Sequence, residues 1–165
     1  GPGWAGRGPG HCRQAFGHGW AVGRSRAPRT ARRAAAAGFE RLVQALWDDK
    51  DAAAARRVLE EGGVDLSQRL NGKTALHYAA LDGHVDLVRE MVAQGADINA
   101  VDEQRGTDGM TPLIWAAMQG QAEVCAALVA LGADASLKEK GGMTALEMAR
   151  AYDHHRAAEA LEEAR

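Results

Sequence analysis

The chain has 165 residues, of which 46% are hydrophobic, 5% aromatic and 25% charged, and its net charge is −2. Alanine dominates the hydrophobic fraction, which favours closely packed helices over a β-sandwich, and the length suits one domain with a tail. The two cysteines exclude a disulfide framework, and no apolar run approaches the ~18 residues of a membrane-spanning helix.

Residues 1–38 differ in composition from the remainder of the chain. They are rich in Gly, Arg and Ala and contain seven arginines and no acid, so all 22 acids lie in residues 39–165. We expect residues 1–38 to form a disordered basic tail; a targeting segment and a cloning remnant are the alternatives. We expect an intracellular protein, cytoplasmic by default, and mitochondrial or chloroplast if residues 1–38 derive from a transit segment.

The sequence of residues 39–68 predicts a polar helical unit that precedes the remaining part of the chain, residues 69–165. Two helical runs, 39–47 and 51–61, are followed by a stop with two consecutive glycines at 62–63. Charged residues on the first run are typical of a unit that covers the end of a helical stack. We therefore expect a capping unit at 39–68.

Three segments further along the chain, 71–84, 108–121 and 141–154, align with one another. Thr111 and Thr144 are 33 residues apart, while Thr74 and Thr111 are 37 apart, which places a four-residue insertion around 105–108. Self-similarity at a fixed period is the signature of a repeat architecture. The pattern predicts repeats at about 69–101, 102–137 and 138–165.

Each repeat carries local signals for two short helices. Thr74, Thr111 and Thr144 stand where a helix N-cap is needed, and Pro112 suits the first helical position after its threonine. Second helical runs end at Gly-Ala-Asp in the first two repeats, and the glycine can take the left-handed conformation of a helix stop. Helices of about ten residues are marginal alone, so the repeats must stack.

The motif Gly-x-Thr-(Pro/Ala)-Leu-x-x-Ala, together with Gly-Ala-Asp, resembles the ankyrin-repeat family over residues 39–165. The resemblance implies an all-α solenoid of stacked helix-turn-helix units with hairpin-like finger loops. It implies a protein–protein interaction module, an adaptor or assembly subunit, that binds a partner protein on its concave side. His77 stands at the family's structural histidine position, whereas Ile114 and Glu147 replace it in the other repeats.

The resemblance places partner contacts on the finger tips and at the exposed ends of the first helices. Carried over by position, these residues are Leu70, Asn71, Lys73, Leu81 and Asp82 in repeat one, Glu103, Gln104, Arg105, Met110, Met118 and Gln119 in repeat two, and Lys140, Met143 and Tyr152 in repeat three. Exposed apolar patches mark contact sites, and five of these residues, Leu81, Met110, Met118, Met143 and Tyr152, form a candidate patch. The alternative is that neighbouring repeats cover several of them.

Catalytic and metal-binding patterns are missing from the sequence, so we expect no enzyme activity, cofactor or metal. The adjacent pair His154–His155 points in directions about 100° apart on a helix, and His11, Cys12 and His18 do not match a four-ligand spacing. Cys125 lies in an apolar helical run and is expected to be buried.

Two other functions stay open. The Arg-rich tail would bind nucleic acid or an anionic membrane, with the repeats as support. Alternatively, the chain is a regulatory segment of a larger protein.

Overall fold

The structure is a computed structural model that describes residues 29–47, 50–106 and 109–164. The chain divides into two compact units, Gly1–Arg32 and Arg33–Arg165. In the first unit the described residues, 29–32, are helical. The tail that we expect at 1–38 lies outside the described residues over 1–28.

Eight helices lie within the described residues. They are α2 (Arg29–Trp47), α3 (Ala52–Glu61), α4 (Ala75–Asp82), α5 (Val85–Ala93), α6 (Pro112–Met118), α7 (Ala122–Ala130), α8 (Ala145–Ala151) and α9 (His155–Glu163). The first of them begins well before residue 39, so residues 29–38 are helical rather than part of an irregular tail. Alanine and arginine are among the strongest helix formers, and this stretch contains little else.

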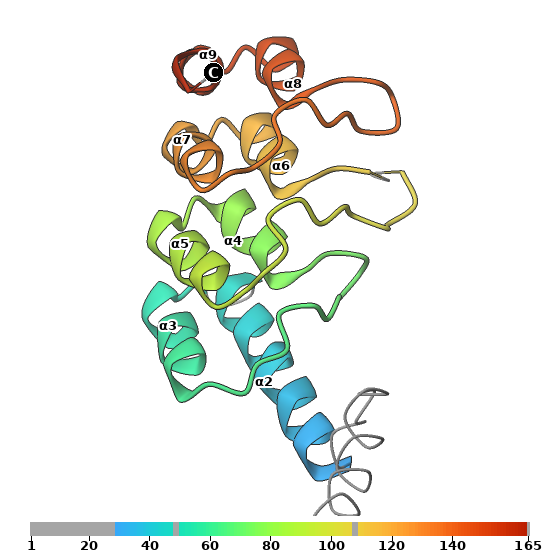
Figure 1. The fold of residues 1–165 in the computed structure, drawn as a ribbon, viewed down its shortest axis with the longest axis vertical. Helices are drawn as coiled ribbons and strands as arrows, with labels where there is room; N and C mark the ends of the chain where they lie inside the picture. The colour runs from blue at the N-terminus through green and yellow to red at the C-terminus, as the bar shows by residue number, and fades with distance from the viewer. Residues whose placement is uncertain (1–28, 48–49, 107–108, 165) are drawn as a thin grey trace, which may run out of the picture. The chain divides into compact units, whose positions relative to one another are not determined.

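The repeats build two layers of helices and a row of loops (Figure 1). Helices α4, α6 and α8 lie beside the loops, and α5, α7 and α9 form the layer behind them. We name the loops finger one (67–73), finger two (101–110) and finger three (138–143). Finger one is closed by a bridge between Leu70 and Lys73, and finger two by a hydrogen bond from the Asp102 N–H to the Met110 carbonyl of 2.9 Å. This is the all-α ankyrin-type solenoid with hairpin-like fingers that the sequence predicts.

Two of the predicted threonine caps, in repeats two and three, form side-chain hydrogen bonds to the first helical turn. The Thr111 hydroxyl accepts a hydrogen bond from the Ile114 N–H at 3.3 Å. In repeat three, the Thr144 hydroxyl accepts from the Glu147 N–H, and the Glu147 carboxylate accepts from the Thr144 N–H at 2.8 Å. Each side chain thus satisfies a backbone donor that the first helical turn leaves unpaired.

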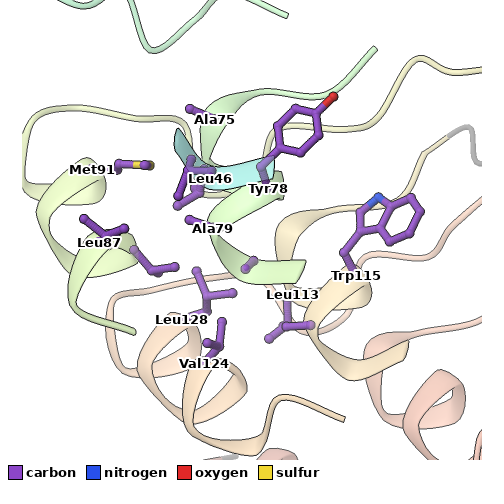
Figure 2. Packing of buried hydrophobic residues seen from close by; sticks show 14 of the residues in the cluster. Leu46, Ala75, Tyr78, Ala79, Leu87, Met91, Leu113, Trp115, Val124 and Leu128 are labelled. Carbon is purple, nitrogen blue, oxygen red and sulfur yellow. The ribbon is translucent and has the colours of Figure 1, made fainter. Parts of the chain in front are cut away.

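A continuous apolar core fills the space between the two helical layers (Figure 2). Leu87, Val88 and Met91 of α5 are at most 1% exposed, and Leu128 of α7 is fully buried. Ala79 has no exposed surface either, which shows how closely the first helices approach their neighbours. Full burial of an aliphatic side chain contributes about 1.5–3 kcal/mol, so stacking supplies the stability that short helices lack alone.

Cys125 belongs to this core, as predicted. Its side chain is fully buried and forms no disulfide. Burial raises the pKa of the Cys125 thiol to about 12, which keeps it protonated and makes it a poor nucleophile. Cys125 therefore acts as a small apolar packing residue.

None of the helices in the described part of the chain is long and apolar enough to cross a membrane.

Candidate functional site

A groove lies where the end of α2, finger one, α4 and finger two meet. Its volume is about 280 Å³. The lining residues, which together define the Trp47 groove, are Val43, Trp47, Leu70, Asn71, Lys73, Tyr78 and Gln104. The groove thus draws on the capping unit, on repeat one and on the finger of repeat two.

Two aromatic rings from different repeats form the apolar wall of the groove. The ring centroids of Trp47 and Tyr78 are 5.5 Å apart and the ring planes make an angle of 71°, an edge-to-face arrangement that aromatic pairs prefer. Trp47 is 51% exposed and Leu70 is 42% exposed, whereas Tyr78 is buried at 4%. The groove therefore exposes the apolar side chains of Trp47 and Leu70, and Trp47 packs against the buried ring of Tyr78.

Tyr78 also ties finger one to the first helix of its repeat. Its hydroxyl donates a hydrogen bond to the Leu70 carbonyl at 2.9 Å. Burial raises the pKa of Tyr78, so the phenol keeps the proton with which it holds the finger. The finger and the aromatic wall consequently keep a fixed relation to each other.

A buried ion pair supports the groove from below. The Lys73 ammonium lies 3.2 Å from a carboxylate oxygen of Asp102. The same oxygen accepts a hydrogen bond from the Trp115 indole N–H at 3.2 Å, and the other accepts from the Gln104 N–H at 2.8 Å. The Lys73 Nζ is also 4.8 Å from the centre of the Trp115 ring, within range of a cation–π contact. These contacts fix finger two against finger one.

Figure 2 shows Tyr78 of α4 and Trp115 of α6 on one side of their helices, away from Leu87 and Val124. The two aromatic residues occupy the same position in their repeats, as the alignment predicts. Trp115 is buried at 8%, so it forms part of the support, while the wall of the groove comes from Tyr78 and Trp47.

His77 links repeats one and two, the structural role that the resemblance implies. Its Nε2 lies 3.1 Å from the Met110 carbonyl, and its Nδ1 accepts a hydrogen bond from the Thr74 N–H at 3.1 Å. Since a carbonyl can only accept, Nε2 carries the proton. Burial lowers the pKa of His77 to about 4, so the imidazole is neutral at pH 7.

The structure gathers four of the predicted contact residues in the groove: Leu70, Asn71, Lys73 and Gln104. Lys73 corrects the expectation of a free contact residue, because its side chain is 10% exposed and its ammonium faces Asp102. A charged residue at a finger is buried here because a carboxylate from the next repeat meets it. The remaining three are exposed, and their role in partner contact stays a prediction.

The other predicted contact residues lie outside the groove. Four of these are exposed: Glu103, Arg105, Gln119 and Lys140. Asp82 is half-buried and its carboxylate lies 3.8 Å from the Lys50 ammonium. The four-residue insertion falls in finger two, where Arg105 and Gly106 are exposed and residues 107–108 lie outside the described part. Their assignment to partner contact stays a prediction.

The predicted apolar patch is not a single exposed surface. Met110 is buried at 5%; its carbonyl closes finger two and also accepts from His77 of repeat one. Leu81, Met118 and Met143 are half-buried, and Tyr152 alone is exposed, at 55%. Neighbouring repeats therefore cover much of this set, which was the alternative expectation.

Sequence reasoning missed Trp47, Val43 and Tyr78 as lining residues of the groove and Asp102 as their support. Trp47 is the last residue of α2, in the capping unit, which lacks the repeat motif, so the motif does not mark it as a contact residue. A tryptophan at the end of such a helix was the available signal. Asp102 gave none, because its partner Lys73 lies in another repeat.

His154 of the adjacent histidine pair contacts the backbone of repeat two. The His154 Nε2 is 2.9 Å from the Met118 carbonyl, which assigns this nitrogen to a contact between repeats two and three. No group of three or more metal-ligating side chains occurs among the residues that the structure describes. His11, Cys12 and His18 lie outside them.

Comparison with known proteins identifies the same repeats. Family models described as ankyrin repeats match residues 28–102 and 76–129, which together cover more than half of the chain. The chain is 47% identical over 47 residues to ankyrin repeat domain-containing protein 49 of Homo sapiens and of Bos taurus, a match that covers 28% of this chain and 20% of those proteins. It is 54% identical over 43 residues to ankyrin repeat domain-containing protein 29 of Homo sapiens, covering 26% and 14% of the two chains. The match thus spans about one fifth or less of each relative.

Proposed function

We propose that this chain, which belongs to the ankyrin-repeat family, is an adaptor or assembly subunit that holds a partner protein in the Trp47 groove. Ankyrin repeats generally mediate protein–protein interaction. The observation that carries the proposal is the Trp47 side chain, which is 51% exposed although its ring packs against buried Tyr78.

The energetics of interfaces favour this position. Tryptophan is enriched among the few residues that dominate binding energy, and such residues lie in pockets near the centre of an interface. The base of the groove is held by the Tyr78–Leu70 hydrogen bond and the Lys73–Asp102 pair. A surface held in its binding geometry before association loses little conformational entropy when a partner arrives.

Exposed polar residues supply a rim around this apolar centre. Glu103 and Arg105 are exposed on finger two, and Asn71 is an exposed lining residue on finger one. A polar rim around an apolar centre is the usual anatomy of a protein interface. We expect the rim to set the orientation of the partner and the groove to supply most of the affinity.

The test is capture of partner proteins by the full chain and by two groove variants, Trp47→Ala and Leu70→Asp. We expect both substitutions to abolish capture of proteins that the unchanged chain retains, while circular dichroism shows unchanged helix content. Leu131→Ala is the matched control, because Leu131 is also an exposed large hydrophobic residue, at 40%, and neither lines the groove nor belongs to the predicted contact residues. Capture that survives in both groove variants would overturn the proposal.

Met110 is unsuitable for such a test. It is 5% exposed, so an aspartate there would bury an unpaired charge and unfold the repeat. Loss of capture would then report loss of the fold.

A further inference from the structure

The second helices of the three repeats form one layer, and α7 lies in its middle. Figure 1 shows α7 between α5 and α9, on the side of the stack away from the fingers, and α7 packs against both neighbours. One of its nine residues, Glu123, is charged. Its surface carries the exposed side chains of Ala126 and Ala130 and the half-buried side chain of Val129. A helix that is apolar on nearly all sides is normally covered, yet the described residues leave this face of α7 open to solvent.

The two helices that flank α7 carry opposite charges at equivalent positions. At one aligned position α5 has Asp86 and α9 has Arg156; one helical turn further on, α5 has Arg89 and α9 has Glu159. All four side chains are exposed. Asp86 contacts Arg56 at 3.5 Å while its side chain stays 82% exposed, and the other three form no ion pair within the described residues. The layer therefore has an uncharged centre between two flanks whose charges are opposite in sign.

This pattern is complementary to itself in one orientation. When a two-fold axis runs parallel to α7 over its exposed face, α7 meets its own copy, and α5 of each copy meets α9 of the other. Asp86 then faces Arg156 of the other copy, and Arg89 faces Glu159 of the other copy. Complementary charges of this kind fix the orientation and register of an interface.

An antiparallel pairing of the helices uses the surface less well. With a two-fold axis perpendicular to α7 at the middle of the helix, Arg89 would face Arg89 and Glu159 would face Glu159, and such like-charge contacts are unfavourable. Moving that axis toward the N-terminal ends of the helices relieves the repulsion, but then only the first turns overlap and Ala130 stays exposed. The parallel pairing covers the whole apolar face of α7.

We propose that the chain forms a symmetric dimer with a second copy of itself through α5, α7 and α9. Alanine at positions 126 and 130 lets the two copies of α7 approach to the usual distance between packed helices, about 8–10 Å. The two copies of Glu123 repel each other at one end of this contact. Arg156 lines the same pocket as Glu123, so each of these carboxylates has a cation beside it.

The dimer goes beyond the proposed function. The Trp47 groove lies where α2, α4 and the first two fingers meet, on the opposite side of the stack from α7. A dimer therefore leaves both grooves open and joins two of them in one assembly. Two linked sites bind a partner that carries two copies of its motif more tightly than either site alone.

Sedimentation equilibrium of the full chain tests for self-association. We expect a monomer–dimer equilibrium within about 1–200 µM, because an interface with charged flanks and a small apolar centre has modest affinity. A chain that stays monomeric over this range overturns the inference. Growth into larger assemblies also overturns it, since a two-fold contact closes on itself.

Charge reversals test the orientation. Arg89→Glu and Glu159→Arg each set like charges against one another, and each alone should raise the dissociation constant of the dimer at least about tenfold. The double variant restores opposite charges at both contacts, and an equimolar mixture of the two single variants does the same in a heterodimer. We expect both to return to within about threefold of the unchanged chain. The antiparallel pairing sets Asp86 against Arg89 and cannot be rescued by the double variant, so a double variant that stays weak contradicts the inference.

A charge in the centre of the face tests the part played by α7. Ala126→Glu should raise the dissociation constant at least about tenfold, because two glutamates then meet near the axis. Ala53→Glu is the matched control, since Ala53 is exposed on α3, outside the three contact helices, and it should change the constant less than about twofold. Circular dichroism checks that both variants keep their helix content. Association of Ala126→Glu that equals that of the control overturns the inference.

The dimer and the proposed function fail separately because they use opposite sides of the stack. Ala126→Glu should leave capture of partner proteins intact, and Trp47→Ala should leave dimerisation intact. If Trp47→Ala abolishes dimerisation, the self-contact lies at the groove and the inference falls. If Trp47→Ala leaves capture intact while the charge reversals behave as expected, the proposed function falls and the dimer stands.

Discussion

The junction between repeats one and two differs from that between repeats two and three in how polar groups cross it. At the first junction the His77 imidazole reaches the Met110 carbonyl and the Lys73 ammonium reaches Asp102. At the second, the position of His77 is occupied by Ile114, whose side chain cannot hydrogen-bond. The same helical stack thus accepts both arrangements. The Trp47 groove includes Lys73 and Gln104, so it adjoins the junction between repeats one and two, which His77 and Lys73 cross.

The fingers show the same contrast at one equivalent position. Asp102 in finger two and Glu139 in finger three each close their loop through the backbone, by bonds to Met110 and Met143. The Asp102 carboxylate faces Lys73 and Trp115. The Glu139 carboxylate instead accepts from N–H groups of its own finger, at Gly141 and Met143. An acid at this position can therefore either join two repeats or stiffen one finger.

The largest expected effect comes from removing the charge that crosses the first junction. Asp102→Asn leaves the Lys73 ammonium buried without a counter-charge, and breaking one side of a buried ion pair typically costs about 3–5 kcal/mol. We expect the free energy of unfolding in urea to fall by that amount. Glu139→Gln, at the equivalent position of finger three, should lower it by about 1 kcal/mol or less.

A second substitution checks the cause. Met110 and Met143 occupy the position of Lys73 in the other fingers, so Lys73→Met is compatible with the loop. In the double variant with Asp102→Asn no buried charge remains, and we expect most of the lost stability to return. If the double variant is as unstable as Asp102→Asn alone, the ion pair is not what holds the fingers.

The second prediction uses acid to weaken the same junction. The pKa of His77 is lowered to about 4 by burial, from 6.5 in an exposed histidine. The unfolded chain therefore takes up a proton near pH 6.5 and the folded chain near pH 4, so acid favours unfolding. This contribution is fully present above pH 6.5 and disappears as the pH falls to about 4, for a loss on the order of 3 kcal/mol.

Urea unfolding at a series of pH values tests this dependence. We expect His77→Gln to show a shallower loss of stability between pH 6.5 and 4 than the unchanged chain. His155→Gln is the control, since His155 is exposed and meets water in both the folded and the unfolded states. A His77→Gln variant with the full acid dependence would show that other groups produce it.

The contrast between the junctions also explains what the sequence could predict. Threonine caps, glycine stops and the 33-residue spacing predict the helices and their stacking. The fingers and the structural role of His77 are implied by the resemblance to ankyrin repeats. The burial of Lys73 and Met110 depends on contacts with another repeat, and no motif records such a contact. Residues 29–38 show no apolar periodicity, and their helix follows from the high helix propensity of alanine and arginine.

The third prediction concerns the second junction. Gly120 has a φ of 73°, and a Cβ added there would lie 2.7 Å from the Nδ1 of His154, whose Nε2 contacts the Met118 carbonyl. Gly120→Ala should cost about 2 kcal/mol or more, from left-handed backbone strain and from the displaced imidazole. Gly132→Ala isolates the strain, because Gly132 has a φ of 99° and nothing within 4 Å of an added Cβ. We expect it to lose about 1 kcal/mol less than Gly120→Ala in thermal or urea unfolding; equal losses would show that the His154 contact contributes nothing.

The smallest effect is expected at the turn of repeat three, where Asp153 takes the place of Gly83 and Gly120. All three residues have positive φ, and Asp153 has a φ of 59°. Aspartate tolerates this conformation better than most residues but less well than glycine, while its charge near the start of α9 favours the helix by about 0.3–1 kcal/mol. Asp153→Gly therefore changes two things at once, and Asp153→Asn removes the charge alone. We expect the glycine variant to unfold at a higher urea concentration than the asparagine variant. The difference in the free energy of unfolding should be about 0.5 kcal/mol. If the asparagine variant is the more stable, the entropy that glycine adds to the unfolded chain outweighs the strain that it relieves. The turn of repeat three is then as well adapted to Asp153 as the turns of repeats one and two are to glycine.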